Sequence, residues 1–325
     1  MNRLQLSLAC GEYEILRALA DGDVRPDGID LTVLNHDKER IFRLDRRNEC
    51  DVAEFNIVQY LKARDAGEPL VALPVFPHRR FRHGSIFVNT EAGITGPDDL
   101  RGKAMGIGGF EPAAAVWIRG ILRDQYGIGH DEIDWQDVYG RLGRLPDGQR
   151  EALKPGQTAT RQSIDELVLD GTLAGIASAY IPQAFVKGDP RIGRLFPDYA
   201  AVERDYFQTF GIFPTMHVLT IKSDIVEKHP WVPASLFQAF TLAKKVALDR
   251  LHDPRYLPLA FLQSVQEEQA QLLGEDPWAY GLTSSNRLAV DAVNRYCLEL
   301  GLITDLLSLD DLFIETDDYS GAKLI

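Results

Sequence analysis

Cysteine and long hydrophobic runs are both scarce in the 325-residue sequence. Cys10, Cys50 and Cys297 are widely spaced and form no CxxC pair, so neither a zinc ribbon nor a thioredoxin-type redox site is supported. Three thiols without a disulfide pattern fit a reducing compartment, and we expect a cytoplasmic protein. No segment approaches the ~18 consecutive apolar residues that span a bilayer, so no membrane association is expected.

Basic residues are fewer than acidic residues in this chain. The chain has 35 Lys and Arg against 48 Asp and Glu, which gives a net charge of −13. An acidic surface repels phosphate backbones and anionic lipids, so the sequence predicts neither a nucleic-acid nor a membrane partner. Any local cluster of basic residues is therefore informative.

Several sequence motifs of cofactor and catalytic sites are missing. The chain has no GxGxxG, no GxxxxGK[ST], no HExxH and no GxSxG, and its seven histidines are scattered. We therefore expect no nucleotide cofactor, no metal and no serine nucleophile. The apolar stretch Leu4–Ala9 is too short for a secretion signal and alternates like a β-strand, so export is not expected.

Apolar periodicity predicts strands that alternate with helices. Strands are expected at Leu4–Ala9, Ile29–Leu34, Asp51–Phe55, Leu70–Phe76 (broken by Pro74), Ala104–Ile107, Leu173–Ala179 and Gly211–Lys222, and a second α/β unit begins after Ser85–Asn89. Helices are expected at Glu12–Ala20, Asp37–Arg47, Asn56–Asp65, Pro112–Tyr126, Arg161–Asp170, Leu236–Leu251 and Ser284–Leu300, with a short element at Leu309–Ile314 and a loop at Gly140–Gly156.

The short loops between these elements indicate βαβ units and largely parallel sheets. Two such units joined by two extended segments predict an α/β protein with two lobes and a central cleft. Lobe 1 would comprise residues 1–83 and 217–325, and lobe 2 residues 84–216. Ligand-binding groups in such folds lie at the carboxyl ends of strands and face the cleft.

Several strings are similar to those of a known family. Asp98–Lys103, before a strand and a glycine turn, resembles the lobe-entry motif of type 2 periplasmic-binding-protein folds. The more specific strings are Pro74–Pro77, Arg80–His83, Trp117–Gly120, Gly211–His217, His229–Trp231 and Trp278–Gly281. Together they resemble the 4,5-dihydroxyphthalate decarboxylase family from about Leu4 to Phe313, whereas Tyr139–Gln162 matches no motif. The resemblance implies a binding-protein fold that decarboxylates an aromatic acid in the cytoplasm without a cofactor.

The strongest basic cluster is Arg79–His83. A guanidinium group can bind an aromatic carboxylate through two parallel hydrogen bonds, and Arg80 and Arg82 are the candidates. In an extended segment these two arginines point to one side and His83 to the other, so all three face one ligand only if the chain turns. The alternative is a solvated basic turn.

Two histidines lie on the proposed crossovers, His83 on the first and His217 on the second. An imidazole that titrates near neutral pH suits proton transfer, and we assign them as the catalytic pair, with Glu54 as an alternative base. A single histidine in an apolar run such as Ile212–Ile221 can instead be a buried structural residue.

Four further residues are candidates for substrate binding. Tyr13 and Asn56 follow predicted strands, although Asn56 can equally be a helix N-cap. Phe110, at a helix start, could stack on an aromatic ring, and Arg119 belongs to one of the strings that carry the resemblance.

Two classes of function remain open. The first is a decarboxylase that converts 4,5-dihydroxyphthalate to 3,4-dihydroxybenzoate and CO2. The second is a non-catalytic solute-binding protein or cytoplasmic sensor for a small aromatic carboxylate, because the fold alone does not distinguish chemistry from binding. A homo-oligomer is compatible with either class.

Overall fold

The computed structural model describes all residues except 1–2, 36–49, 139–160, 254, 317–322 and 325. The predicted helix at 37–47 and the predicted loop at 140–156 lie outside the described residues. The chain divides into two compact units. Unit 1 comprises Met1–Arg79, Thr215–Asp291 and Asp305–Ile325, and unit 2 comprises Arg80–Pro214 and Ala292–Thr304. The units change between Arg79 and Arg80 and between Pro214 and Thr215. The predicted lobe limits at residues 83 and 217 stay a prediction.

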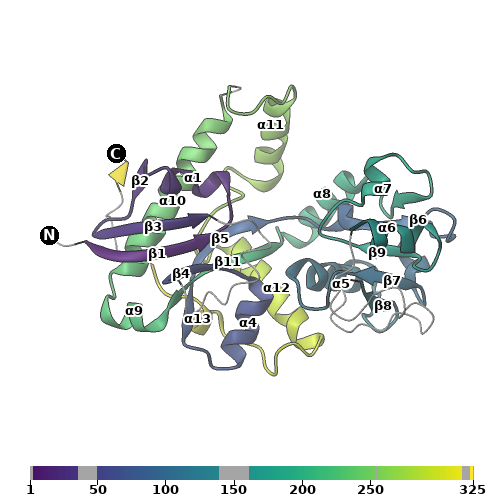
Figure 1. The fold of residues 1–325 in the computed structure, drawn as a ribbon, viewed down its shortest axis with the longest axis horizontal. Helices are drawn as coiled ribbons and strands as arrows, with labels where there is room; N and C mark the ends of the chain where they lie inside the picture. Colours follow the sequence, from purple (N-terminus) through teal and green to yellow (C-terminus); the bar gives the residue numbers. More distant parts are fainter. Residues whose placement is uncertain (1–2, 36–49, 139–160, 254, 317–322, 325) are drawn as a thin grey trace. The chain divides into compact units, whose positions relative to one another are not determined.

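Unit 1 is built on a five-stranded sheet in the order β3-β1-β4-β11-β5 (Figure 1). The strands are β1 (Leu4–Cys10), β3 (Ile29–Asn35), β4 (Val52–Asn56), β5 (Leu70–Arg79) and β11 (Thr215–Lys222). Strand β1 runs parallel to β3 and β4, whereas β11 runs antiparallel to β4 and β5. The sheet is therefore mixed rather than largely parallel as predicted, because β11 enters it from the opposite direction after the chain has passed through unit 2.

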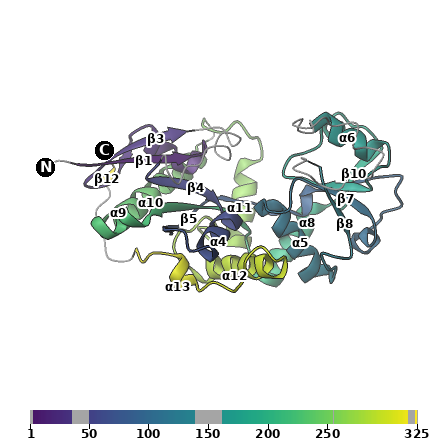
Figure 2. The ribbon, with the colours of Figure 1, turned by 60° about the horizontal axis from the view of Figure 1, so that its bottom comes forward.

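Helices pack on both faces of this sheet. One face carries α1 (Arg17–Ala20) and α10 (Val232–Leu251), whose buried Leu236, Phe240 and Ala243 join Leu6 and Leu8 in one core. The other carries α4 (Ile57–Asp65) and α13 (Leu309–Leu312), which Figure 2 brings forward. The sequence predicts the apolar stripe of α10 because these residues repeat at helical spacing.

The remaining elements of unit 1 are shorter or peripheral. They are η1 (Glu14–Leu16), β2 (Val24–Arg25), α9 (Ser223–Lys228), α11 (Leu262–Leu273), the first half of α12 (Ser284–Glu299) and β12 (Lys323–Leu324). The predicted helix at Glu12–Ala20 is a 3₁₀ turn followed by one helical turn.

Unit 2 has its own mixed sheet, in the order β10-β6-β9-β7-β8. Its strands are β6 (Ile86–Asn89), β7 (Ala104–Ile107), β8 (Asp134–Asp137), β9 (Gly175–Ala177) and β10 (Ile192–Arg194). Its helices are η2 (His83–Ser85), η3 (Pro97–Leu100), α5 (Ala113–Tyr126), α6 (Arg161–Leu169), α7 (Gln183–Val186), α8 (Tyr199–Phe210) and the second half of α12. The predicted strand at Ala104–Ile107 is confirmed.

Strand β5 corrects one prediction. The sequence predicts a strand that Pro74 breaks and that ends at Phe76, yet β5 continues to Arg79 through both Pro74 and Pro77. The sheet order places β5 at the edge, where a proline that lacks a backbone N–H costs no ladder hydrogen bond on the outer side. The extension matters because it carries His78 into the sheet.

Cys10, Cys50 and Cys297 are all buried, and none forms a disulfide. Within the part of the chain that the structure describes, no helix has the length and apolar content needed to cross a membrane.

Candidate active site

Four polar side chains gather at one edge of the unit 1 sheet. Tyr13 follows β1, Glu54 lies near the end of β4, and His78 lies near the end of β5. Strand β11 runs the other way, so its beginning, with His217, lies at the same edge. The carboxyl ends of β1, β4 and β5 and the amino end of β11 therefore bring these residues together, at the edge where α/β sheets bind ligands.

Glu54 is the centre of this group and is only 4% exposed. Its Oε2 accepts a hydrogen bond from the backbone N–H of Gly11 at 2.7 Å. Its Oε1 accepts one from the Tyr13 hydroxyl at 2.5 Å and contacts Nδ1 of His217. A buried carboxylate needs such donors, because without them its charge is strongly destabilised.

These contacts decide the charge of Glu54. Burial alone would raise the pKa of this carboxyl, but the hydrogen bond and charge of His217, with the Tyr13 and Gly11 donors, lower it below the usual 4.5. Glu54 is therefore ionised near neutral pH. A carboxylate with a lowered pKa is a weak base, so it suits orienting His217 better than removing a substrate proton.

Tyr13 is held in its neutral form. Burial, followed by the negative charge and hydrogen bond of Glu54, raises the pKa of its phenol far above the usual 10. Its hydroxyl lies 3.2 Å from Nδ1 of His217 as well, so it touches both members of the Glu54–His217 pair. Tyr13 thus acts as a fixed hydrogen-bond donor.

The sheet register explains how His217 reaches Glu54. His217 is opposite Asn56, and Glu54 is opposite Leu219, so His217 and Glu54 are diagonal neighbours on one face. The contact with a carboxylate favours a proton on Nδ1 of the imidazole, which then donates to Glu54. A base oriented by a buried carboxylate is a recurring feature of catalytic sites.

His78 is a member of this group that the sequence does not predict. It is opposite His217 in the β5–β11 register, and the two rings meet edge to face with centroids 4.8 Å apart. The ring of Tyr13 lies 6.0 Å from that of His78. The only sequence signal is its place directly after Pro77, beyond the expected end of the strand.

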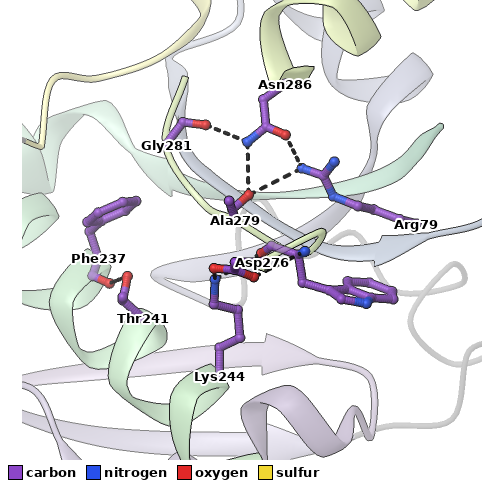
Figure 3. A network of polar contacts seen from close by, with 9 residues as sticks. Arg79, Phe237, Thr241, Lys244, Asp276, Ala279, Gly281 and Asn286 are labelled. Atoms are coloured by element: carbon purple, nitrogen blue, oxygen red, sulfur yellow. Dashed lines mark hydrogen bonds and ion pairs between the residues drawn. The ribbon is translucent and has the colours of Figure 1, made fainter. Parts of the chain in front are cut away.

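A polar network anchors the end of β5 one residue after His78 (Figure 3). Arg79 is 4% exposed, and its guanidinium donates to the Asn286 side chain and to the Ala279 carbonyl. Asn286 in turn donates to the carbonyls of Ala279 and Gly281. Burial lowers the pKa of Arg79 to about 10. The network ties the edge strand to the loop before α12.

The same loop is held from the other side by Lys244. Its ammonium group binds the Asp276 carboxylate and the Trp278 carbonyl, and it lies 4.8 Å from the centre of the Tyr280 ring. Figure 3 shows Lys244 on α10 reaching up to Asp276. The string Trp278–Gly281 is thus part of the support of the sheet edge.

Asn56 is the N-cap of helix α4, which is one of the two roles that the sequence allows. Its side-chain oxygen accepts a hydrogen bond from the Val58 N–H at 2.9 Å, which caps α4. It also lies opposite His217 in the sheet. Its substrate contact stays a prediction.

His83 lies in unit 2 and is fully buried there. Its Nε2 is 2.8 Å from the Gln125 side-chain oxygen, and its ring packs beside Phe196 and Tyr206. Burial lowers the pKa of this imidazole despite the Gln125 hydrogen bond. The predicted catalytic role of His83, as the partner of His217, stays a prediction.

The two arginines before His83 differ in environment. Arg80 is exposed, whereas Arg82 is 3% exposed. Burial and the charge of Arg80 lower the pKa of Arg82 to about 9, opposed by Glu203. The chain turns here into η2 rather than staying extended. A buried guanidinium whose charge is destabilised gains from an additional anion, which supports the predicted role of Arg82.

Arg119 and Phe110 form a local contact in unit 2. The Arg119 guanidinium donates to the Phe110 carbonyl and to the Ala115 carbonyl, and it lies 5.6 Å from the centre of the Phe110 ring. Burial lowers the pKa of Arg119 to about 10. Phe110 is 39% exposed, so its ring is accessible for stacking. Both substrate contacts stay predictions.

Cavities and metal ligands add little to this picture. A cavity of about 230 Å³ beside Tyr13 is lined by Glu12, Glu14 and Asp21 as well as Arg17, an acidic surrounding that would repel a dicarboxylate. Among the residues with a described placement, no three His, Cys, Asp or Glu side chains lie close enough to hold a metal ion.

Two known proteins that have similar sequences carry the same name. A 4,5-dihydroxyphthalate decarboxylase of Comamonas testosteroni is 34% identical over 295 residues, which cover 88% of this chain and 89% of the relative. Another, of Pseudomonas putida, is 34% identical over 220 residues, or 65% of this chain and 84% of the relative. No family model matches the chain.

Solved structures share the architecture of this chain, although their sequence identity to it is low. The aliphatic sulphonate binding protein SsuA of Escherichia coli is 13% identical, with a TM-score of 0.57, and the match covers 100% of this chain and 96% of SsuA. The desulfurization enzyme DszB is 16% identical, with a TM-score of 0.55 and 96% of each chain covered. At these identities the likeness shows the fold alone, and it confirms the predicted periplasmic-binding-protein-like class. This fold serves a binding protein in one neighbour and an enzyme in the other.

Proposed function

The chain belongs to the 4,5-dihydroxyphthalate decarboxylase family, and from this we propose that it converts 4,5-dihydroxyphthalate to 3,4-dihydroxybenzoate and CO2. The observation that carries the proposal is the hydrogen-bonded group of Tyr13, Glu54 and His217 at the edge of the unit 1 sheet. A protein that only binds a carboxylate needs complementary donors, whereas this group contains a base with its own orienting carboxylate.

The reaction requires two proton transfers before CO2 leaves, and a third restores the hydroxyl group afterwards. Each carboxylate of 4,5-dihydroxyphthalate has a hydroxyl para to it. Removal of that hydroxyl proton pushes electron density to the ring carbon that bears the carboxylate, and this carbon then accepts a proton. The carbon–carboxylate bond breaks, its electrons restore the aromatic ring, and CO2 leaves. The phenolate recovers a proton, so one proton is consumed in each turnover.

We assign removal of the hydroxyl proton to Nε2 of His217. Glu54 holds Nδ1–H and offsets the positive charge that develops on the imidazole, so we assign it as a positioning residue rather than as the base. Tyr13, kept neutral, fixes the carboxylate in this geometry. General base assistance of this kind typically contributes ~10²–10⁴-fold to the rate.

Binding of the second carboxylate stays assigned to Arg82, with Arg80, Phe110 and Arg119 as further candidates. The support for Arg82 is its burial, since a guanidinium removed from water is stabilised by an anion. A planar guanidinium also matches the geometry of a carboxylate.

The direct test is CO2 release from 4,5-dihydroxyphthalate by the purified protein, with His217→Gln and Glu54→Gln as matched variants. We expect turnover by the wild type and a loss of at least ~10²-fold in kcat in His217→Gln. Tight binding of the substrate without CO2 from the wild type would overturn the proposal and favour the solute-binding or sensor function.

We also infer a cytoplasmic location. Its support is the presence of three buried cysteines without a disulfide, which fits a reducing compartment. Fractionation of cells followed by detection of the protein tests this inference.

A further inference from the structure

We propose that His78 is the second proton-transfer residue of this site and that it donates the proton to the ring carbon that loses CO2. The inference rests on the proposed decarboxylation and deepens it, because it assigns the proton transfer to the ring carbon to a named group.

The position of His78 relative to His217 is the first argument. The two residues face each other across β5 and β11, and their rings meet at 78° with centroids 4.8 Å apart. The register shifts on both sides of His217, between Thr215 and His217 and between His217 and Leu219. Such irregularities re-aim side chains and are frequent beside active sites. Two imidazoles thus share one sheet edge.

The chemistry of the substrate is the second argument. The hydroxyl oxygen that loses a proton and the carbon that gains one lie at opposite ends of the same ring. A single imidazole oriented toward the hydroxyl does not reach the carbon in the same pose. His217 is fixed by Glu54, so a second group must supply the proton, and His78 is the imidazole beside it.

Burial is the third argument. His217 is 5% exposed, whereas His78 is half-buried. Each turnover consumes one proton, which must come from solvent. The half-buried imidazole can be protonated again between turnovers more readily than the buried one, which suits it to the acid role.

The support of β5 is the fourth argument. An edge strand has a neighbour on one side only, so its end would be free to move. The hydrogen bonds of Arg79 to Asn286 and Ala279 fix the backbone one residue after His78 (Figure 3). A proton donor must be held in place to act, and this network supplies that rigidity.

The experiment compares His78→Gln and His217→Gln, with His252→Gln as the matched control, since His252 is exposed at the end of α10 in the same unit. Steady-state CO2 release gives kcat, and the ultraviolet spectrum of bound substrate reports phenolate, because ionised catechols absorb at longer wavelength. We expect His78→Gln to lower kcat ~10²–10⁴-fold while bound substrate still shows the phenolate band. In His217→Gln that band should be lost, and His252→Gln should match the wild type.

Chemical rescue separates a proton donor from a structural residue. We expect added imidazole to restore part of kcat to His78→Ala, a variant that leaves space for it, and to leave the control variant unchanged. A His78→Gln variant that binds 3,4-dihydroxybenzoate as the wild type does and keeps its kcat would overturn the inference. So would a loss of kcat in both His78 variants that imidazole does not restore. An inactive wild type would instead refute the proposed function.

Discussion

Nδ1 of His217 binds Oε1 of Glu54, although the two residues are 163 positions apart in the sequence. The contact exists because β11 returns from unit 2 and pairs antiparallel with β4, which makes the two residues diagonal neighbours. The proposed base and its orienting carboxylate are therefore assembled by strand pairing, and their geometry depends on the register of the sheet.

The charge of Glu54 is expected to matter for turnover. Glu54→Gln keeps the size of the side chain but removes the charge that stabilises a protonated His217, so kcat should fall ~10²-fold while KM changes little. Steady-state kinetics of CO2 release measures both constants. An unchanged kcat would show that His217 does not depend on Glu54.

Glu54 should also make stability depend on pH. Its pKa is lower in the folded protein than the usual 4.5, so its stabilising contribution is complete above that value and is lost as the pH falls through the folded pKa. Urea unfolding of the wild type and Glu54→Gln between about pH 7 and pH 3 should give a difference in unfolding free energy that shrinks toward low pH. A constant difference would contradict this prediction.

Arg82 should govern affinity rather than the chemical step. We expect Arg82→Ala to raise KM strongly, and Arg82→Lys to restore only part of the affinity, because an ammonium group cannot make two parallel hydrogen bonds to a carboxylate. Because Arg82 is buried, thermal unfolding of both variants must accompany the kinetics. Equal KM values in both variants and the wild type would exclude a contact with substrate.

The Lys244–Asp276 pair should contribute to stability. The Lys244 side chain is 5% exposed and that of Asp276 is 42% exposed, so Asp276→Asn leaves a buried ammonium without its counter-charge. We expect a loss of about 1–3 kcal/mol in unfolding free energy. Asp249→Asn is the control, because the exposed Lys245–Asp249 pair should be worth about 0.5 kcal/mol or less. Equal losses in urea titrations would contradict this expectation.

Close packing in unit 2 gives a prediction independent of the active site. A Cβ added at Gly120 on α5 would lie 2.3 Å from the Tyr296 ring, whose hydroxyl is held by Asp124. Gly120→Ala should therefore lower the unfolding free energy by about 1–3 kcal/mol or more. Gly96→Ala is the control, since an added Cβ there meets no atom within 4 Å. An unchanged unfolding free energy in Gly120→Ala would mean that α12 can shift away without loss of stability.

The sequence predicts part of this site because strand ends are visible in it. Tyr13 follows one short apolar strand and Glu54 lies near the end of another, and the carboxyl ends of such strands meet at one edge. His217 stands out as the one histidine in a long apolar run. These three signals depend only on local pattern.

His78 escapes prediction for a physical reason. Pro74 and Pro77 indicate a broken strand unless β5 is known to be an edge strand, and edge position depends on pairing far along the chain. The burial of His83 and Arg82 also depends on residues far along the chain. A run of basic residues looks solvated until the partners that cover it, such as Tyr206 and Phe196 around His83, are known.

The course of β5 has a consequence for association between molecules. An unpaired sheet edge invites a strand from another chain, which can lead to aggregation. Here the two prolines remove backbone donors from the edge, the Pro74 carbonyl accepts a bond from the Gly281 N–H, and Ile314 N–H donates to the Ala72 carbonyl. The contacts that support β5 thus also disfavour strand addition at this edge, whereas β3 forms the opposite edge of the same sheet.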